Sequence, residues 1–327
     1  MKILVFGFSV TGDPQGYVEF WKNRYSANHS DIELDKIAIG GLTPAQGRHL
    51  VSSMIQQYQP SILIFEISTP IYRLRIGTAD NITEHTETVN FLVRLCEENG
   101  ILCGFLDLPQ ESLDKSRDWM GNIHHDLLGA LGVPLASVDL QPSTLRDNVH
   151  PNDTGRAIYA DALEDLVGRV RLSTSRNYYL AKSDIFFDAV HVEDLERDAD
   201  EFVEFERNGF RTRMLLLSAG QGVNLKLSQP ATIVGVIVAM GPKTGYMDIR
   251  MNGVGEVISC YDINCYYLRV GARLLPPRTG DTITVVQGQQ VPDIFPLKGT
   301  KDPGERVGGI THVLFQKDWP VSLNSFL

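Results

Sequence analysis

The chain has 327 residues, enough for two domains that each bury a core of their own. Hydrophobic residues make up 43% of it and charged residues 21%, which is typical of an ordinary soluble globular protein. The formal net charge of −10 argues against nucleic acid or an anionic membrane as the main partner.

The first half of the chain alternates short apolar runs with amphipathic stretches. The apolar runs predict strands at residues 2–8, 34–39, 61–67, 101–106 and 133–138. The intervening stretches predict helices around 17–25 and at 44–57, 84–99, 113–131 and 153–170. Such alternation predicts an α/β fold, a flavodoxin-like parallel sheet with helices on both faces. In sheets of this kind the ligand site lies beyond the carboxyl ends of the strands.

After residue 171 the pattern changes. Residues 172–210 are rich in Asp and Glu, and we expect an acidic, solvated connection there. Residues 211–327 hold short alternating runs separated by Gly, Pro, Asn and Asp turns, without a convincing helix. The predicted strands are 213–217, 223–227, 232–239, 246–251, 256–261, 266–274, 282–287 and 311–316. This spacing predicts an all-β sandwich of the jelly-roll kind, so residues 1–171 and 211–327 are the two expected domains.

The chain begins with a basic residue and an apolar run, as a signal peptide does. The run ends at Phe8 without a small-residue cleavage site, so we interpret it as the first buried strand. No run of about 18 apolar residues appears, and no membrane span is expected. The cysteines Cys96, Cys103, Cys260 and Cys265 lack Cys-x-x-Cys spacing. Reduced thiols in a cytoplasmic protein are expected, with a Cys260–Cys265 disulfide as the alternative for an exported protein.

Two short segments carry the side chains of a serine hydrolase site. Ser9 ends the first apolar run, and Asp147 and His150 stand just before the last predicted α/β helix. Together they supply a hydroxyl, a carboxylate and an imidazole. Alternatively, each is a turn or helix-capping residue, as isolated Ser, Asp and His residues often are. Their order and positions favour the triad.

These segments resemble the sequence blocks of the SGNH/GDSL hydrolases over roughly residues 1–170. Ser9 corresponds to the nucleophile of the family's Gly-Asp-Ser turn, with Phe8 in place of the Asp. Gly41 corresponds best to the oxyanion-hole glycine of the second block. Asp147 and His150 match the family's Asp-x-x-His. The resemblance implies that Ser9 attacks an acyl carbon, His150 accepts its proton and Asp147 orients the imidazole.

The third block departs from the family. Its Gly-x-Asn-Asp, whose Asn donates to the oxyanion, is replaced by residues 66–69, which contain no Asn. The expected oxyanion hole therefore uses the backbone N–H groups of Ser9 and Gly41. The Ser68 hydroxyl, or that of Thr69, is the candidate for the third donor.

No other pattern predicts a cofactor or a metal site. His124 and His125 are adjacent on a predicted helix, where side chains diverge by about 100° and cannot share one metal ion. His85 stands beside Glu84 and Glu87 at an expected helix start, where solvated charges are ordinary. The phosphate loop, the dinucleotide Gly-x-Gly-x-x-Gly and the His-Glu-x-x-His zinc motif are missing.

The resemblance implies a serine esterase that removes a short acyl group, such as acetyl, from a carbohydrate or glycan through an acyl-enzyme. The appended β domain favours a sugar-linked substrate, because family members with such partners often act on acylated carbohydrates. Two alternatives stay open. One is an acyltransferase to a sugar hydroxyl with the same triad. The other is a non-catalytic glycan-binding protein with a decayed hydrolase domain, which the missing Asn would explain.

Overall fold

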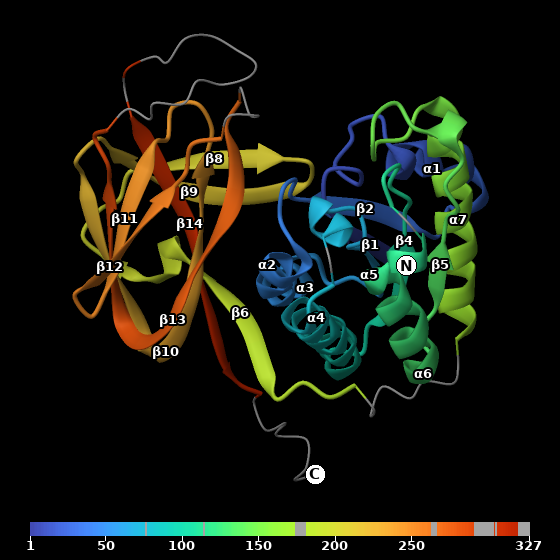
Figure 1. Cartoon of the computed structure of the whole chain (residues 1–327), viewed down its shortest axis with the longest axis horizontal. Helices are drawn as coiled ribbons and strands as arrows, with labels where there is room; N and C mark the ends of the chain where they lie inside the picture. Colours follow the sequence, from blue (N-terminus) through green and yellow to red (C-terminus); the bar gives the residue numbers. More distant parts are fainter. Residues whose placement is uncertain are drawn as a thin grey trace. The chain divides into compact units, whose positions relative to one another are not determined.

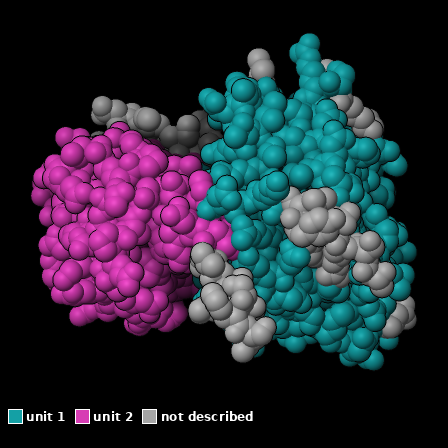
Figure 2. Space-filling model, turned by 90° about the horizontal axis from the view of Figure 1, so that it is seen from below, with its two compact units in different colours: residues 1–184, 208–210 teal, residues 185–207, 211–327 magenta. Residues whose placement is uncertain are grey.

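The computed structural model describes residues 1–75, 77–113, 115–173, 181–262, 267–290, 304 and 306–319. The chain divides into two compact units, traced in Figure 1 and coloured separately in Figure 2. The first unit comprises residues 1–184 and 208–210, and the second comprises residues 185–207 and 211–327.

The first unit is built on a parallel sheet. Its strands are β1 (Lys2–Gly7), β2 (Glu33–Ala38), β3 (Ile62–Glu66), β4 (Leu102–Asp107) and β5 (Leu135–Ser137). They lie in the order β2-β1-β3-β4-β5, and every neighbouring pair is parallel. This is the flavodoxin-like order, which confirms the predicted fold class. All five residues of β3 are buried, as expected for a strand covered on both faces.

Helices cover both faces of this sheet (Figure 1). They are α1 (Tyr17–Tyr25), α2 (Pro44–Gly47), α3 (Val51–Tyr58), α4 (Ala79–Glu98), α5 (Trp119–Ile123), α6 (Gly129–Leu131) and α7 (Asp153–Leu172). Short 3-10 turns include η2 (Arg48–Leu50) and η3 (Ile71–Leu74), and a π-helical turn, η5 (His124–Leu128), joins α5 to α6. Successive strand residues point to opposite faces, so Ile3 packs with Trp21 of α1 and Leu163 of α7. Phe6 instead packs edge-on against Phe65.

One predicted helix starts later than expected. The helix predicted at 113–131 begins only at Trp119, because Asp118 caps it by accepting the Gly121 N–H. Conversely, α4 begins five residues before the predicted 84–99, at Ala79, where Thr78 accepts the Asn81 N–H. In both helices the capping side chain, rather than the apolar periodicity, determines the first turn.

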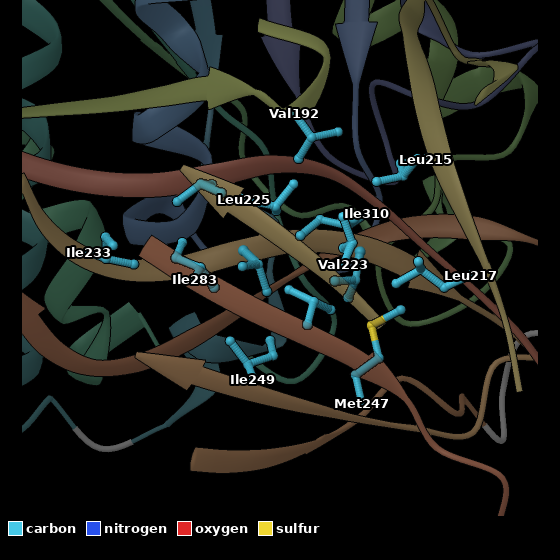
Figure 3. Close-up of a cluster of buried hydrophobic side chains, with 14 of the residues drawn as sticks. Val192, Leu215, Leu217, Val223, Leu225, Ile233, Met247, Ile249, Ile283 and Ile310 are labelled. Atoms are coloured by element: carbon cyan, nitrogen blue, oxygen red, sulfur yellow. The ribbon is translucent and has the colours of Figure 1, made fainter. Parts of the chain in front are cut away.

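The second unit is an antiparallel β domain. Its strands are β6 (Ile185–His191), β7 (Glu196–Arg197), β8 (Phe202–Arg207), β9 (Phe210–Ser218), β10 (Gly222–Met240), β11 (Tyr246–Met251), β12 (Val254–Ser259), β13 (Arg269–Gln287) and β14 (Val307–Asp318). Pairing runs β12-β11-β13-β10-β14-β9-β8, with β6 on β14 and β7 on β10. Aliphatic side chains from most of these strands fill its core (Figure 3). The predicted all-β second domain is confirmed.

Two details of this domain correct the sequence analysis. Runs 223–227 and 232–239 form one strand, β10, and runs 266–274 and 282–287 largely fall in another, β13. Pro230 lies where the β10–β13 register shifts between Lys226 and Ala231. The sequence analysis placed a break between the two runs, but a bulge accommodates Pro230 within one continuous strand.

Residues 185–207, expected within the acidic connection, instead form β6, β7 and β8. Most side chains of β8 are exposed or half-buried, which lets Glu204 and Glu206 lie in a strand. An acidic composition therefore reflected a solvent-facing strand rather than a linker.

Three cysteines are buried free thiols: Cys96, Cys103 and Cys260. Burial raises the pKa of the Cys260 thiol to about 12, so it stays protonated. Cys265 lies outside the described residues. Over the ranges given above, no helix is long and apolar enough to cross a membrane.

Candidate active site

Three of the predicted site residues, Ser9, Gly41 and Thr69, line a cavity at the carboxyl edge of the parallel sheet, and Asp147 and His150 lie in the loop that borders it. Ser9 follows β1, Gly41 follows β2, Thr69 follows β3, and the loop with Asn148 and Val149 precedes α7. All five line one cavity of about 510 Å³. The sheet topology thus gathers four segments that lie far apart in the sequence.

Ser9 stands in a tight turn directly after β1. The Phe8 carbonyl accepts the Gly12 N–H at 2.8 Å and closes the turn. The Ser9 side chain is half-buried, and it makes no side-chain hydrogen bond with any residue the structure describes. Gly40 lies opposite: a Cβ added there would be 3.8 Å from the Ser9 Cβ. The hydroxyl is therefore uncommitted at the wall of the cavity.

Asp147 and His150 form a hydrogen-bonded pair. Both carboxylate oxygens of Asp147 lie 3.0 Å from Nδ1 of His150. The same carboxylate accepts the backbone N–H groups of Val149 at 3.0 Å and His150 at 2.8 Å. Partial burial raises the pKa of Asp147, but these N–H groups and the imidazole outweigh it and hold the pKa below its ordinary value. An ionised Asp147 keeps the proton on Nδ1 and leaves Nε2 as an acceptor.

The loop that carries this pair is held at both ends. The Arg146 N–H donates to the His150 carbonyl at 2.9 Å, so the backbone turns back on itself. Asn152, the N-cap of α7, accepts the Gly155 N–H through its side chain and donates through its amide to the Ser143 carbonyl. The spacing of Asp147 and His150 is thus fixed by backbone hydrogen bonds rather than by the side chains alone.

Two arginines tie this loop to the segment that follows Ser9. The Arg146 guanidinium lies 2.9 Å from the Asp13 carboxylate. Arg156 of α7 donates to the Gln15 carbonyl at 2.6 Å. No hydrogen bond joins Ser9 to His150 among the described residues. Catalytic hydrogen bonds are often loose until substrate is bound.

The backbone around the cavity offers donors for an oxyanion. Gly41 has a φ of 82°, a left-handed conformation that favours glycine. No described acceptor takes the backbone N–H of Ser9 or of Gly41. Both groups lie at the cavity, so the predicted pair of backbone donors has no competing partner within the protein.

The two hydroxyls of the third block both lie near the buried Glu66, but only Thr69 also lines the cavity. Ser68 is fully buried; its Oγ accepts the Leu108 N–H at 2.9 Å and lies 3.4 Å from the Glu66 carboxylate. It does not line the cavity. Thr69 does line it and is 5% exposed, and its buried Oγ1 lies near the Glu66 carboxylate. The structure therefore directs Ser68, the expected donor, into the interior.

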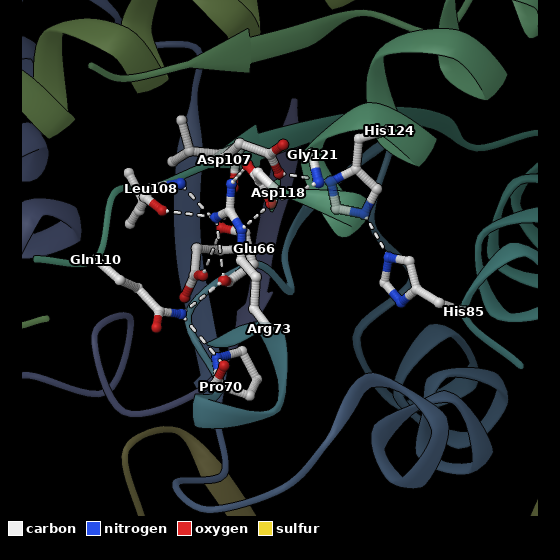
Figure 4. Close-up of polar contacts among 12 residues, drawn as sticks. Glu66, Pro70, Arg73, His85, Asp107, Leu108, Gln110, Asp118, Gly121 and His124 are labelled. Atoms are coloured by element: carbon white, nitrogen blue, oxygen red, sulfur yellow. Dashed lines mark hydrogen bonds and ion pairs between the residues drawn. The ribbon is translucent and has the colours of Figure 1, made fainter. Parts of the chain in front are cut away.

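A buried arginine fixes this segment. Nη1 of Arg73 donates to the carbonyls of Ser68 at 3.2 Å and Leu108 at 3.0 Å (Figure 4). Its Nε and Nη2 bind the Asp118 carboxylate through two parallel hydrogen bonds. The Gln110 amide adds a bond of 3.0 Å to the Ser68 carbonyl. The backbone of the third block is thus held rigidly at the cavity wall.

Asp107, His124 and His85 form a buried chain of hydrogen bonds that the sequence patterns did not predict. Nδ1 of His124 lies 2.7 Å from the Asp107 carboxylate, and its Nε2 lies 2.8 Å from Nε2 of His85 (Figure 4). His85 is 1% exposed, so its expected solvated environment was wrong. It continues the buried stripe of Thr88, Val89 and Leu92 along α4, a helical spacing readable in the sequence. Within the described ranges no three His, Cys, Asp or Glu residues could hold a metal ion.

The buried His85 predicts a loss of stability in acid. Burial, together with the charges of His124 and Arg73, holds the pKa of His85 well below its ordinary 6.5. Below that pH the unfolded chain binds a proton that the folded chain does not, so the free energy of unfolding decreases. We expect the Tm of the wild type to fall more between pH 7 and pH 5 than that of His85→Gln.

The matched control is His125→Gln, since the His125 side chain is 84% exposed. It should follow the wild type in a series of thermal melts. Parallel curves for the wild type and His85→Gln would contradict the assignment.

The chain is similar to known proteins in structure rather than in sequence. No protein-family model matches the chain, and no curated protein sequence matches it. Among solved structures, a two-domain esterase (CEX) active on acetylated mannans matches with a TM-score of 0.66 and 13% identity, over 98% of this chain and 92% of that one.

Two further solved structures match about half of the chain. The acetyl xylan esterase AlAXEase has a TM-score of 0.46 and 17% identity, over 51% of this chain and all of its own. A lipolytic protein of the G-D-S-L family from Desulfitobacterium hafniense DCB-2 has a TM-score of 0.42 and 12% identity, over 50% of this chain and 98% of its own. Along nearly its whole length the chain therefore shares the fold of a two-domain esterase.

Proposed function

We propose that the chain is a serine esterase that removes a short acyl group, acetyl in the simplest case, from a carbohydrate. The observation that carries this proposal is the hydrogen bond between Asp147 and Nδ1 of His150, in the loop that borders the Ser9 cavity. It leaves Nε2 of His150 as the base for an uncommitted hydroxyl.

The reaction follows from these groups. Ser9 Oγ attacks the acyl carbon while Nε2 of His150 takes its proton. The backbone N–H groups of Ser9 and Gly41 stabilise the oxyanion, and the alcohol leaves with the proton from His150. Water then attacks the acyl-enzyme, gives a proton to His150, and the carboxylic acid is released as Ser9 regains its proton. Asp147 stabilises the imidazolium in both steps.

The cavity suits a polyol. Beside the aromatic Tyr72, its lining includes the hydroxyl and amide side chains of Thr43, Gln46, Gln110 and Asn148. Such groups exchange hydrogen bonds with sugar hydroxyls, while aromatic and aliphatic surfaces pack against the ring. The similar two-domain esterase acts on acetylated mannans, which supports the same class of substrate.

The experiment is to measure acetate release from p-nitrophenyl acetate, acetylated mannan and acetylated xylan, with and without a mannose oligosaccharide as acceptor. An esterase releases acetate from the polysaccharides whether or not the acceptor is present. Acetylation of the oligosaccharide at the expense of free acetate would identify an acyltransferase. Binding of the glycans without turnover of any ester would identify a non-catalytic protein.

The third block supplies a separate prediction. Thr69 is the residue of the third block that lines the cavity, so we propose that its hydroxyl, which lies near Glu66, turns to the oxyanion as the third donor. Thr69→Val keeps the shape and removes the hydroxyl. We expect kcat to fall by roughly 10-fold to 10³-fold with little change in KM. Full activity of Thr69→Val in steady-state kinetics would show that the backbone donors suffice.

A further inference from the structure

Glu66 is a fully buried carboxylate directly beneath the Ser9 turn. It is the last residue of β3, and it is 0% exposed. Its Oε2 accepts the Thr11 hydroxyl at 2.9 Å, and its Oε1 lies 3.4 Å from the Ser68 hydroxyl. Backbone N–H groups of Phe8 and Thr69 also donate to it. One carboxylate thus receives donors from both sides of Ser9 and from the third block.

The Thr11 contact is built tightly. A Cβ added at Gly7 would lie 2.2 Å from Thr11 Oγ1, so the hydroxyl fits only because residue 7 is glycine. The hydroxyl of Tyr17, the first residue of α1, also lies 2.9 Å from Thr11 Oγ1 and forms a second hydrogen bond with it. Phe8 itself brings no polar side chain to the turn. Glu66 and Thr11 are therefore the polar side chains that hold the backbone around Ser9.

Among the described residues, no cation lies within hydrogen-bond distance of the Glu66 carboxylate. Arg73 from η3 faces the carboxylate, but its guanidinium bonds Asp118 and two carbonyls. The other titratable groups that face it are Tyr17 of α1 and the buried, unpartnered hydroxyl of Tyr159 of α7. Burial raises the pKa of Glu66 to about 7, although the donated hydrogen bonds lower it. Keeping a carboxylate here costs stability that a neutral side chain would not.

We propose that Glu66 is a positioning residue: its carboxylate fixes the backbone on both sides of Ser9 and so aims the nucleophilic Oγ and the Ser9 N–H at the bound ester. The inference rests on the proposed function. A turn held by backbone hydrogen bonds alone would be free to shift, and misplacement of a reacting group by about 1 Å costs roughly 100-fold in rate. Position, rather than stability, is what the carboxylate supplies.

Glu66→Gln tests this with opposite effects on activity and stability. The amide has the same shape but accepts fewer hydrogen bonds and carries no charge. We expect kcat for p-nitrophenyl acetate to fall about tenfold or more while KM stays within about twofold. Because burial raises the pKa of Glu66 from 4.5 to about 7, the free energy of unfolding of the wild type decreases as pH rises from about 4.5 to about 7, where the buried carboxyl loses its proton. Glu66→Gln should therefore unfold at a higher temperature than the wild type at pH 8.5, and at a similar temperature at pH 5.

Two further variants complete the design. Thr11→Val removes the hydrogen bond between the Thr11 hydroxyl and the Glu66 carboxylate, so kcat should fall. The loss in kcat of the double variant Thr11→Val/Glu66→Gln should be smaller than the sum of the two single losses. Glu33→Gln, on the exposed first residue of β2, is the matched control and should change neither kcat nor Tm. On the acid side, log kcat/KM of Glu66→Gln should fall less steeply with pH than that of the wild type, because one titrating carboxyl is gone.

The outcomes separate the two proposals. If Glu66→Gln keeps full kcat, or loses activity and thermal stability together at pH 8.5, Glu66 is not a positioning residue. If Ser9→Ala hydrolyses esters as fast as the wild type, the proposed function fails first. A dead Ser9→Ala beside a fully active Glu66→Gln would overturn only the inference on Glu66.

Discussion

Replacing Ser9 by alanine is expected to abolish ester hydrolysis, lowering kcat by on the order of 10⁴-fold or more. The hydroxyl is the attacking group, and no described side chain stands in its place at the cavity. Because Ser9 is half-buried and its side chain makes no hydrogen bond with described residues, its removal breaks no structural contact. The thermal transition of Ser9→Ala should therefore lie close to that of the wild type.

Steady-state kinetics with p-nitrophenyl acetate and a thermal melt measure both effects. Ser61→Ala, at an exposed position just before β3, is the matched control and should retain full activity. Activity of Ser9→Ala equal to that of the wild type would place the nucleophile elsewhere.

His150→Ala is expected to lose nearly as much activity as Ser9→Ala, because nucleophile and base act as a unit. Asp147→Ala should lose less. The backbone bond between Arg146 and His150 still holds the loop in that variant, and water can partly orient the imidazole. The rank order Ser9→Ala and His150→Ala below Asp147→Ala, in kcat at constant pH, checks this.

The double variant His150→Ala/Asp147→Ala should be no worse than His150→Ala alone, since Asp147 acts through the imidazole. A further large loss in the double variant would mean that Asp147 has a role of its own. A loss in Asp147→Ala that exceeds the loss in His150→Ala would contradict the assignment of the pair.

The sequence predicted the framework because its signals are local. A short, largely apolar run such as residues 61–67, with Pro60 before it and Pro70 after it, is typical of a strand covered on both faces, and the order of such runs and helices predicted the parallel sheet. The same argument placed Ser9 and Gly41 at one edge. The Asp147–His150 contact also follows from local geometry, because a three-residue spacing in a turn brings both side chains together.

What the sequence could not give depends on long-range packing. Ser68 and Thr69 are adjacent hydroxyls, and which of them lines the cavity depends on the Leu108 N–H, some 40 residues away. The burial of Glu66 is likewise invisible in sequence, where an isolated acidic residue predicts exposure. One of its donors, the Thr11 hydroxyl, lies 55 residues earlier in the sequence.

The β domain shows a different limit. Pro230 interrupts an apolar run and predicts a turn, yet the neighbouring strand accommodates it in a bulge of one long strand. That distinction depends on the pairing partner β13, which pairs Ala231 with Gly280, about 50 residues later in the sequence.

The most direct test of the central claim is covalent labelling of Ser9. The protein is treated with an alkyl phosphonate ester, which reacts with an activated serine, and the modified peptide is identified by mass spectrometry. We predict one adduct, on the peptide that contains Ser9, formed in step with the loss of esterase activity and missing from both Ser9→Ala and His150→Ala. An adduct on another residue, or esterase activity that survives complete labelling of Ser9, would contradict the account.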